Sequence, residues 1–246
     1  MNKSNFEVLR AGINTTYQDL GRNNLYQIGI PFSGAMDKRN YLLSNNLVGN
    51  KNNTPAIEFA YQGPLLKLNG ERTCLAITGD VNFNILKKNS KIEKGNCYQT
   101  YCLEDGDQID ILSTNKSVYG YLAASGGFEV ELFWNSCSTN TKAKIGANNG
   151  DKLKENDSIK ILKSEKTYQL KKLNYFNTKI EQIRVIKGTN YDYFSDDGKK
   201  NFLEKKFTVS KLTDRMGMRL EGSKIENIID TNIRSEGLIK GVIQVP

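Results

Sequence analysis

The sequence predicts a mainly β fold with few helices. Short segments rich in Ile, Val, Leu, Tyr and Phe recur along the chain, and Gly, Asn and Asp separate them. Only residues 37–47 show a convincing apolar repeat of the helical kind. The chain has 246 residues, 38% of them hydrophobic, which suffices for a sizeable core. Many short strands with few helices are typical of a β-barrel or β-sandwich.

The expected elements follow in chain order. Strands are predicted at 6–10, 56–60, 65–68, 73–78, 83–86, 97–103, 108–112, 118–124, 158–163, 182–187, 207–210 and 239–245. The helix at 37–47 is expected to turn Leu42, Leu43, Leu47 and Met36 to one face, and Gly49-Asn50 ends it. A second helix is expected near 196–204.

One pattern occurs twice in the chain. Residues 103–112 and 153–162 share the form L-x-x-[GN]-D-x-I-x-I-L. It predicts a tight turn, in which Gly106 or Asn156 adopts a positive φ, followed by an alternating strand. Two explanations are open: many turns that lead into a strand have this sequence pattern, or the two segments descend from an ancestral repeat.

The segment 163–181 is the best candidate for a boundary because it is charged and lacks Gly and Pro. We therefore expect a first β-barrel module at 1–175 and a partial second β module at 176–246. The final residues, 242–246, have the pattern of a strand that should be buried against later strands.

Composition excludes several kinds of chemistry. The chain has no histidine, which removes Ser-His-Asp and Cys-His nucleophile systems and the common His-based zinc sites. Acid–base work would fall to Asp, Glu, Lys, Tyr or Cys. The net charge of +8 comes from scattered Lys, which indicates a solvated surface and no nucleic-acid partner. No metal site is expected.

The cysteine pattern and the N-terminal sequence indicate the cellular compartment of the protein. Cys74, Cys97, Cys102 and Cys137 form no CxxC pair. We expect four buried or idle thiols in a cytoplasmic protein, with a disulfide or metal site as the alternative. No apolar run is long enough for a membrane span, and the N-terminus has no apolar signal core, so no membrane or secretion is expected.

Two N-terminal segments could carry chemistry. In residues 15–22, Arg22 could grip a carboxylate or phosphate and Asp19 could act as a base beside Gln18. The alternative is an Asp19–Arg22 pair that stiffens a surface turn. In residues 29–37, Ser33 or Asp37 could cap the following helix, or the helix start could offer N–H groups to an anion.

Two further segments combine polar and flexible residues. Ser125-Gly126-Gly127 follows a strand and could form a nest of N–H groups for an oxyanion, or a plain tight turn. Residues 209–222 contain Asp214, Arg215 and Arg219. The alternation there predicts a strand with Met216, Met218 and Leu220 facing inward.

Read in order, several blocks of this chain resemble one family. The blocks are TTYQDLGR, GIPFSGAMD, NNLVGN, AIEFAYQGP, AITG, YLAASGGF, SCSTNTKAKIG, VSKLTDRMGMRLEG and SEGLIKGVIQVP. They resemble the family of the bacterial 5-oxoprolinase C subunit. It is also called the biotin-dependent carboxyltransferase or allophanate hydrolase subunit 2-like family, and it includes KipA. The resemblance runs from about Gly12 to the last residue.

The resemblance implies cyclophilin-like β-barrel modules and a role in a three-part, ATP-dependent 5-oxoprolinase. That enzyme opens the lactam of 5-oxo-L-proline to L-glutamate with 5-oxoprolinase subunits A and B, of which B is KipI-like. Alternatives are the carboxyltransferase half of a biotin-dependent urea or amide carboxylase, and a KipA-like regulatory partner of a KipI-type inhibitor. Family members continue past the IQVP block, so the second module is expected to be C-terminally incomplete.

Under the enzyme hypotheses, the candidate residues divide into two groups. The catalytic candidates comprise cations for developing charge and carboxylates as the base: Asp19, Arg22, Asp37, Asp214 and Arg215. The candidates for binding the substrate or an oxyanion are Gln18, Ser33, Ser125, Gly126, Gly127 and Arg219. We expect Arg22 to meet Arg215 or Arg219 at a common cleft near Asp19 and the 125–127 turn.

Overall fold

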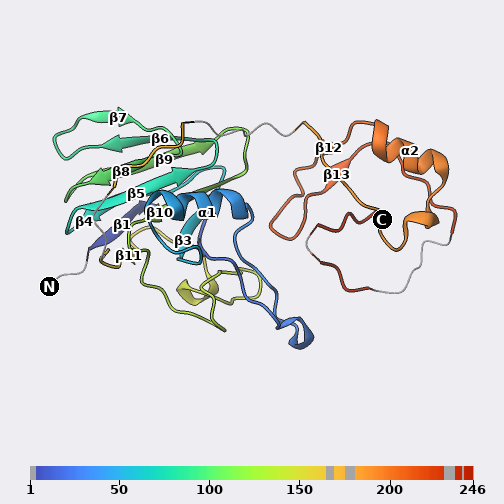
Figure 1. The fold of residues 1–246 in the computed structure, drawn as a ribbon, viewed down its shortest axis with the longest axis horizontal. Helices are drawn as coiled ribbons and strands as arrows, with labels where there is room; N and C mark the ends of the chain where they lie inside the picture. Colours follow the sequence, from blue (N-terminus) through green and yellow to red (C-terminus); the bar gives the residue numbers. More distant parts are fainter. Residues whose placement is uncertain (1–3, 165–168, 175–180, 230–235, 240, 246) are drawn as a thin grey trace. The chain divides into compact units, whose positions relative to one another are not determined.

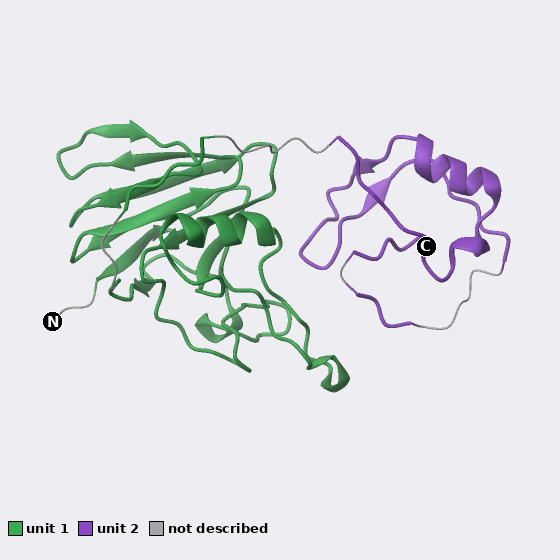
Figure 2. Cartoon of the chain, in the orientation of Figure 1, with its two compact units in different colours: residues 1–176 green, residues 177–246 purple. Residues whose placement is uncertain are grey.

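The computed structural model describes residues 4–164, 169–174, 181–229, 236–239 and 241–245. The chain divides into two compact units, residues 1–176 and residues 177–246 (Figure 2). Parts of the predicted boundary segment 163–181, namely 165–168 and 175–180, lie outside the described residues.

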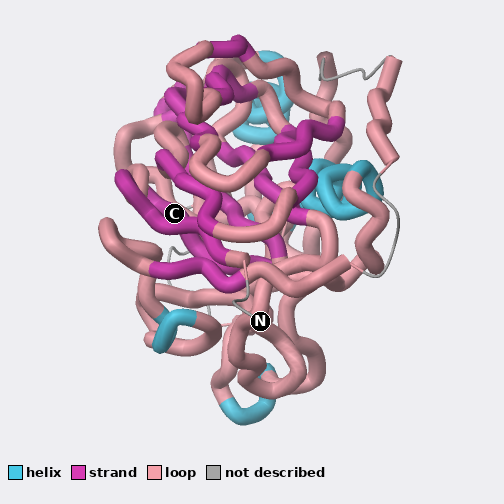
Figure 3. The backbone as a smooth tube through the Cα atoms, turned by 90° about the vertical axis from the view of Figure 1, so that its left-hand side faces the viewer, coloured by secondary structure: helices cyan, strands magenta, loops and turns pink. Residues whose placement is uncertain are grey.

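Unit 1 is built from two antiparallel sheets (Figures 1 and 3). The six-stranded sheet has the order β11 (Ser158–Lys160), β1 (Asn5–Arg10), β4 (Leu65–Asn69), β9 (Gln108–Thr114), β6 (Val81–Leu86) and β7 (Ile92–Lys94). The five-stranded sheet has the order β2 (Asn14–Gln18), β3 (Ala56–Ala60), β10 (Tyr119–Ala124), β5 (Thr73–Thr78) and β8 (Thr100–Leu103). The mainly β prediction is confirmed.

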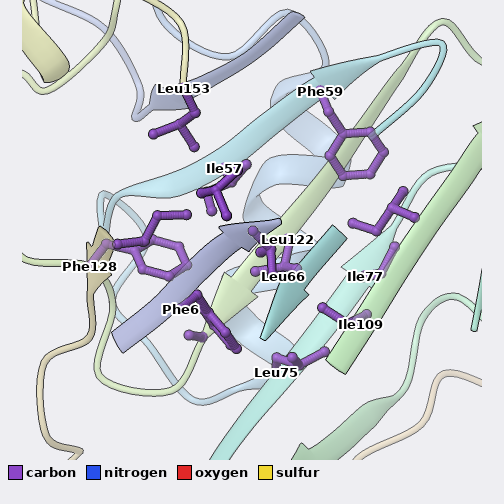
Figure 4. Packing of buried hydrophobic residues seen from close by; sticks show 14 of the residues in the cluster. Phe6, Ile57, Phe59, Leu66, Leu75, Ile77, Ile109, Leu122, Phe128 and Leu153 are labelled. Carbon is purple, nitrogen blue, oxygen red and sulfur yellow. The ribbon is translucent and has the colours of Figure 1, made fainter. Parts of the chain in front are cut away.

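The core lies between the inner faces of these two sheets. Fully buried side chains from β1, β4 and β9 meet others from β3, β5 and β10 (Figure 4). Along β1 and β4, buried residues alternate with half-buried ones, which is the two-residue period of a strand with one face inside. Closure of the sheets into a cyclophilin-like barrel stays a prediction.

Helix α1 (Lys38–Leu47) confirms the predicted helix and covers the outer face of the five-stranded sheet. Its buried face is more polar than expected: Tyr41, Ser44 and Asn45 are buried, whereas Leu42 and Leu43 are half-buried. The polar groups tolerate burial because they are bonded. The Tyr41 hydroxyl donates to the Thr54 carbonyl over 2.7 Å, and the Asn45 amide donates to the same oxygen over 3.0 Å.

Several strand predictions were wrong or incomplete. Strands β2 and β7 were missed, and β8 begins at Thr100 and not at Cys97. Residues 182–187 form no strand, and neither do 239 and 241–245, the described part of the last predicted strand. The apolar alternation is present in these two segments, but a strand also needs a neighbour to pair with, which the sequence of one segment does not specify.

The repeated turn pattern was predicted correctly at its key positions. Gly106 has φ of 87° and Asn156 has φ of 70°, both left-handed. Each turn leads into a strand of the six-stranded sheet, β9 and β11 respectively.

The prediction of four idle thiols was wrong for two of them. Cys74 and Cys102 face each other across the β5–β8 pair and form a disulfide. The strand register that brings them together could not be derived from their spacing. Cys97 and Cys137 are free thiols, and Cys137 is fully buried.

Unit 2 contains α2 (Asp196–Glu204), as predicted, and a short hairpin of β12 (Thr208–Val209) and β13 (Leu220–Glu221). Unit 2 also has a short 3-10 helix at Tyr191–Tyr193, and unit 1 has short 3-10 helices at Tyr26–Ile28 and Asn148–Gly150. Met216, Met218 and Leu220 are exposed, so their predicted inward orientation was wrong. A turn at 214–217 interrupts the expected strand. In the described part of the chain, no helix is long and apolar enough to cross a membrane.

Candidate functional site

A buried carboxylate organises the end of β2. Asp19 follows the strand and is almost fully buried. Its Oδ1 accepts from the Gly21 N–H over 2.8 Å and from the hydroxyls of Ser136 and Ser138 over 2.7 and 2.6 Å. Its Oδ2 accepts from the Cys137 N–H over 2.7 Å. Asp19 thus holds the segment 136–138, more than a hundred residues away in sequence, against the end of β2.

Arg22 is a second buried ion beside this cluster. Its Nη2 donates to the Ser138 carbonyl over 2.7 Å, and its Nε donates to the Phe133 carbonyl over 3.5 Å. Burial lowers the pKa of Arg22, and the nearby Asp19 charge partly offsets that effect. The predicted Asp19–Arg22 grouping therefore exists, but it is an interior arrangement and not a surface turn.

Gln18 is the last residue of β2 and is also fully buried. Its Nε2 donates to Thr16 Oγ1 over 3.0 Å and to the Thr139 carbonyl over 2.9 Å. Its Oε1 and the Nη1 of Arg22 are buried and have no hydrogen-bond partner among the described residues. Gln18 Oε1 is thus an acceptor and Arg22 Nη1 a donor without a partner among the described residues, although buried polar groups normally have one.

Glu58 and Tyr121 belong to the same region and were missed by sequence reasoning. The Tyr121 hydroxyl donates to Glu58 Oε2 over 2.7 Å, and the same oxygen accepts from the Met36 N–H over 2.9 Å. The Tyr121 oxygen also accepts from the Asp37 N–H over 2.7 Å. Burial raises the pKa of Tyr121 well above its ordinary value. The signal for Glu58 was a lone acidic residue inside the apolar block AIEFA.

Asp37 acts as the N-cap of α1. Its Oδ1 accepts from the Asn40 N–H over 3.0 Å and its Oδ2 from the Asn40 side-chain amide over 2.6 Å. Asp37 therefore caps the helix, which was one of the two predicted alternatives, and the Asn40 N–H at the helix start is engaged by this cap. Ser33 has a left-handed φ of 56°, and its Oγ accepts a long hydrogen bond of 3.5 Å from Asn140.

The Ser125-Gly126-Gly127 turn does not offer its N–H groups to a ligand. The Ser125 N–H donates to the Cys74 carbonyl, the Gly126 N–H to Asn50 Oδ1 and the Gly127 N–H to the Ala124 carbonyl, over 2.8 to 3.0 Å. The expected oxyanion nest is corrected to a tight turn, because its donors are already used inside the protein.

The remaining candidates lie in unit 2. Asp214 Oδ1 accepts from the Met216 N–H over 2.7 Å and from the Gly217 N–H over 3.3 Å, which fixes the turn of the hairpin. Burial lowers the pKa of Arg215 to about 10, so it stays protonated at neutral pH. Arg219 is exposed. A common cleft that joins Arg22 to Arg215 or Arg219 stays a prediction.

The described residues offer little to a metal ion or to ATP. No group of three or more His, Cys, Asp or Glu suited to a metal ion occurs among them. A triphosphate needs accessible cations and free N–H groups. The guanidinium of Arg22 is buried against carbonyls and the N–H groups at 125–127 are engaged, so these residues do not fit ATP.

Comparison with known proteins places the chain in a family. Residues 28–246 match the family model described as carboxyltransferase domain, subdomain A and B. The chain belongs to this family. It is 31% identical to the 5-oxoprolinase C subunit of Escherichia coli (strain K12), over 98% of this chain and 76% of that protein. It is 29% identical to the same protein of Haemophilus influenzae, with the same two coverages.

Larger proteins contain a similar region. Urea amidolyase of Saccharomyces cerevisiae is 30% identical over 89% of this chain, which corresponds to 12% of that protein. Among solved structures, the K. lactis urea amidolyase superposes with a TM-score of 0.76 and 26% identity, over 92% of this chain but 14% of that one. The structure of TTHA0988 has a TM-score of 0.76 and 25% identity, over 90% of this chain and 79% of that one.

Proposed function

We propose that this chain is the C subunit of a cytoplasmic, ATP-dependent 5-oxoprolinase complex, which hydrolyses 5-oxo-L-proline to L-glutamate with subunits A and B. The observation that carries the proposal is the similarity to the 5-oxoprolinase C subunit over 98% of the chain, which spans both units. The family resemblance of the sequence blocks supports the same assignment.

Two unpaired polar atoms at the end of β2, Gln18 Oε1 and Arg22 Nη1, support a role in substrate binding. A lactam presents an N–H donor and a C=O acceptor, and Gln18 Oε1 and Arg22 Nη1 are an acceptor and a donor without protein partners among the described residues. We assign Gln18 and Arg22 to lactam recognition, with Asp19 and Ser138 holding Arg22 in place. Because both side chains are buried, the covering segments must part to admit substrate.

The other candidates take different roles in this proposal. Arg215 and Arg219 of unit 2 remain the candidate cations for developing negative charge, and Asp214 remains a candidate base. ATP is assigned to the complex, and the residues that hold it are sought in the partner subunits. In the net reaction, the oxygen of one water joins the carbonyl carbon and becomes part of the new carboxylate, the ring C–N bond breaks, the ring nitrogen becomes the amine of glutamate, and the complex hydrolyses one ATP to ADP and phosphate with a second water.

The test is reconstitution of the full chain with subunits A and B, with release of glutamate and ADP as the readouts. We expect no turnover by the chain alone and ATP-dependent turnover by the three-part complex. Gln18→Met should lower kcat/KM by about tenfold or more, since it removes a polar contact to the substrate. Gln108→Met, on the six-stranded sheet, is the matched control and should leave the rate unchanged. Full turnover by the chain alone would contradict the proposal.

A second candidate function is the carboxyltransferase half of a biotin-dependent urea or amide carboxylase. The similarity to urea amidolyases over 89% of the chain favours it. The ureido ring of biotin also presents N–H and C=O groups, so Gln18 and Arg22 suit either ligand. Neighbouring genes separate the two: genes for subunits A and B support the 5-oxoprolinase, and a gene for a biotin carboxylase supports the carboxyltransferase. The regulatory alternative, a KipA-like partner of a KipI-type inhibitor, would require that the chain binds the inhibitor and that no catalytic turnover occurs.

A further inference from the structure

A hollow on the outer face of the six-stranded sheet of unit 1 lies outside the candidate site described above. Lys67 of β4 and Leu86 of β6 line it, on the face opposite the buried Leu66 and Ile85 (Figure 1). Its volume is about 570 Å³, within the range of roughly 300–1,000 Å³ that is typical of small-molecule sites. The candidate site at the end of β2 belongs to the other sheet.

Two turns form walls of this hollow, and one buried carboxylate joins them. The turns are residues 87–90, between β6 and β7, and residues 104–107, between β8 and β9. Asp107 is 3% exposed, and its Oδ1 accepts from the Lys88 N–H over 3.0 Å. Its Oδ2 accepts from the Glu104 N–H over 3.0 Å and from Lys87 Nζ over 2.8 Å. Because both walls are bonded to one side chain, the hollow is preformed.

The repeated sequence pattern supplies this carboxylate. Asp107 and Asp157 hold the same position in its two copies, and each closes its own turn: Asp157 Oδ2 accepts from the Lys154 N–H over 2.8 Å. Asp107 closes its turn in the same way and also holds the 87–88 segment. The first copy of the pattern therefore does more than lead into a strand, because it fixes the shape of the hollow.

Positive charge exceeds negative charge along the lining. Lys67, Lys87 and Lys88 line the hollow, against the single carboxylate of Asp105. The buried Asp107 neutralises Lys87, and Asp105 lies 3.4 Å from Lys88 in an exposed and therefore weak pair. Lys67 forms no ion pair with a residue in the described part of the chain. One ammonium group is thus available to an anion.

The backbone of the walls favours a carboxylate over a phosphate. Phosphate sites in proteins combine cations with several free backbone N–H groups. Here the N–H groups of Lys88, Ser90 and Gly106 each donate to an acceptor of unit 1, over 2.8 to 3.0 Å. A single ammonium without such N–H groups matches the single charge of a carboxylate.

The hollow also has an apolar side. Leu86 and Ile92 lie opposite each other in the β6–β7 pair, and both line the hollow. Ile92 is 63% exposed and Leu86 is half-buried. A short hydrocarbon chain that lies on these two side chains removes apolar surface from water, which favours binding.

We propose that this hollow binds a small aliphatic carboxylate, with the carboxylate group at Lys67 and the hydrocarbon chain on Leu86 and Ile92. The proposal is independent of the proposed function, because none of these three residues is assigned a part in it.

The experiment is a nuclear magnetic resonance titration of the ¹⁵N-labelled full chain with hexanoate. We expect saturable shifts of the amide signals of residues 67, 86–88 and 92, with a Kd of about 1 mM. Lys67→Met removes the charge and keeps the length of the side chain, so it should weaken binding about tenfold. Lys94→Met, at an exposed position of β7 outside the lining, is the matched control and should leave the Kd unchanged. Circular dichroism checks that both variants are folded.

Two analogues of the probe test the charge and the chain separately. Hexanol, which lacks the charge, should bind more weakly than hexanoate, and hexylammonium, which reverses it, should not bind. Higher salt should weaken binding of hexanoate. Ile92→Ser should weaken it about threefold, because it removes part of the apolar surface.

Several outcomes would overturn the inference. They are the absence of saturable shifts at about 50 mM hexanoate, equal affinities of Lys67→Met and Lys94→Met, and binding of hexylammonium as tight as that of hexanoate. Tighter binding of inorganic phosphate than of hexanoate would show a phosphate site in place of the proposed one. Shifts confined to residues 18–22 would place the carboxylate at the end of β2, which overturns this inference and leaves the proposed function intact.

Discussion

Replacement of Asp19 should destabilise unit 1 because its hydrogen bonds are lost. The geometry of these bonds predicts which of two substitutions lowers the stability more. In Asp19→Ala, four donors lose their acceptor: the hydroxyls of Ser136 and Ser138 and the N–H groups of Gly21 and Cys137. The buried guanidinium of Arg22 also loses the charge beside it. Removing one member of a buried ionic network costs about 3–5 kcal/mol, so we expect a loss in that range.

Asp19→Asn should cost less. Three of the four donors meet at Oδ1, and an asparagine can keep its carbonyl oxygen there. Its amide group then faces the Cys137 N–H, which leaves one unsatisfied donor and no charge beside Arg22. Such a change costs about 1–3 kcal/mol. The predicted order of stability is therefore wild type, then Asp19→Asn, then Asp19→Ala.

Urea denaturation followed by two probes tests this order. Trp134 is the single tryptophan of the chain, and its neighbour Phe133 accepts from Arg22, so its fluorescence reports on this region. Far-ultraviolet circular dichroism reports on the whole chain. Asp105→Ala, at an exposed carboxylate that is paired with Lys88 and accepts from the Gly70 N–H, is the control and should cost much less stability than Asp19→Ala. A loss below about 1 kcal/mol in Asp19→Ala, or equal losses in both Asp19 variants, would refute the reasoning.

Three further predictions follow from other contacts. Tyr121→Phe removes the hydroxyl that joins Glu58 to the start of α1, so stability should fall by about 1–3 kcal/mol and amide exchange at residues 36–37 should accelerate; unchanged exchange contradicts it. Burial raises the pKa of Cys97 from 9.0 to about 11, so the folded state binds a proton that the unfolded thiol has lost. The resulting stability is present below pH 9 and declines between pH 9 and 11, and Cys97→Ser should flatten that decline in pH-dependent melting curves. The Cys74–Cys102 disulfide, at a separation of 28 residues, should contribute about 3–4 kcal/mol, and a melting temperature insensitive to reductant would argue against it.

The sequence was most informative where a strand has one face in the core. The alternation in β1, β4 and β9 follows directly from burial of every second residue, and those strands were predicted. Strand β2 was missed because NTTYQ contains one aromatic residue and no aliphatic one. Its polar residues are buried because other segments supply their hydrogen bonds, and such partners are distant in sequence. The signal in the sequence was the density of polar groups in TTYQDLGR, which pointed to the right place but not to its geometry.

The candidate site shows why carboxylates in turns are easily taken for catalytic bases. Asp19, Asp37 and Asp214 each accept from backbone N–H groups: of Gly21 and Cys137, of Asn40, and of Met216 and Gly217. A side chain that can reach a substrate can also reach a nearby N–H, so caps and turns favour the same residue types as active sites do.

Loss of activity on substitution of any of these three aspartates would therefore not identify a base. A base is identified when stability is retained and the pH profile of kcat/KM loses its acidic limb. Asp19 engages both of its oxygens inside the protein, so its replacement should lower stability and activity together. Gln18 donates to Thr16 and to the Thr139 carbonyl through Nε2 but has an unpaired Oε1 among the described residues, so its replacement should lower kcat/KM by more than the accompanying loss of stability explains. That contrast between two adjacent residues of one strand end separates a residue that builds the site from one that contacts the substrate.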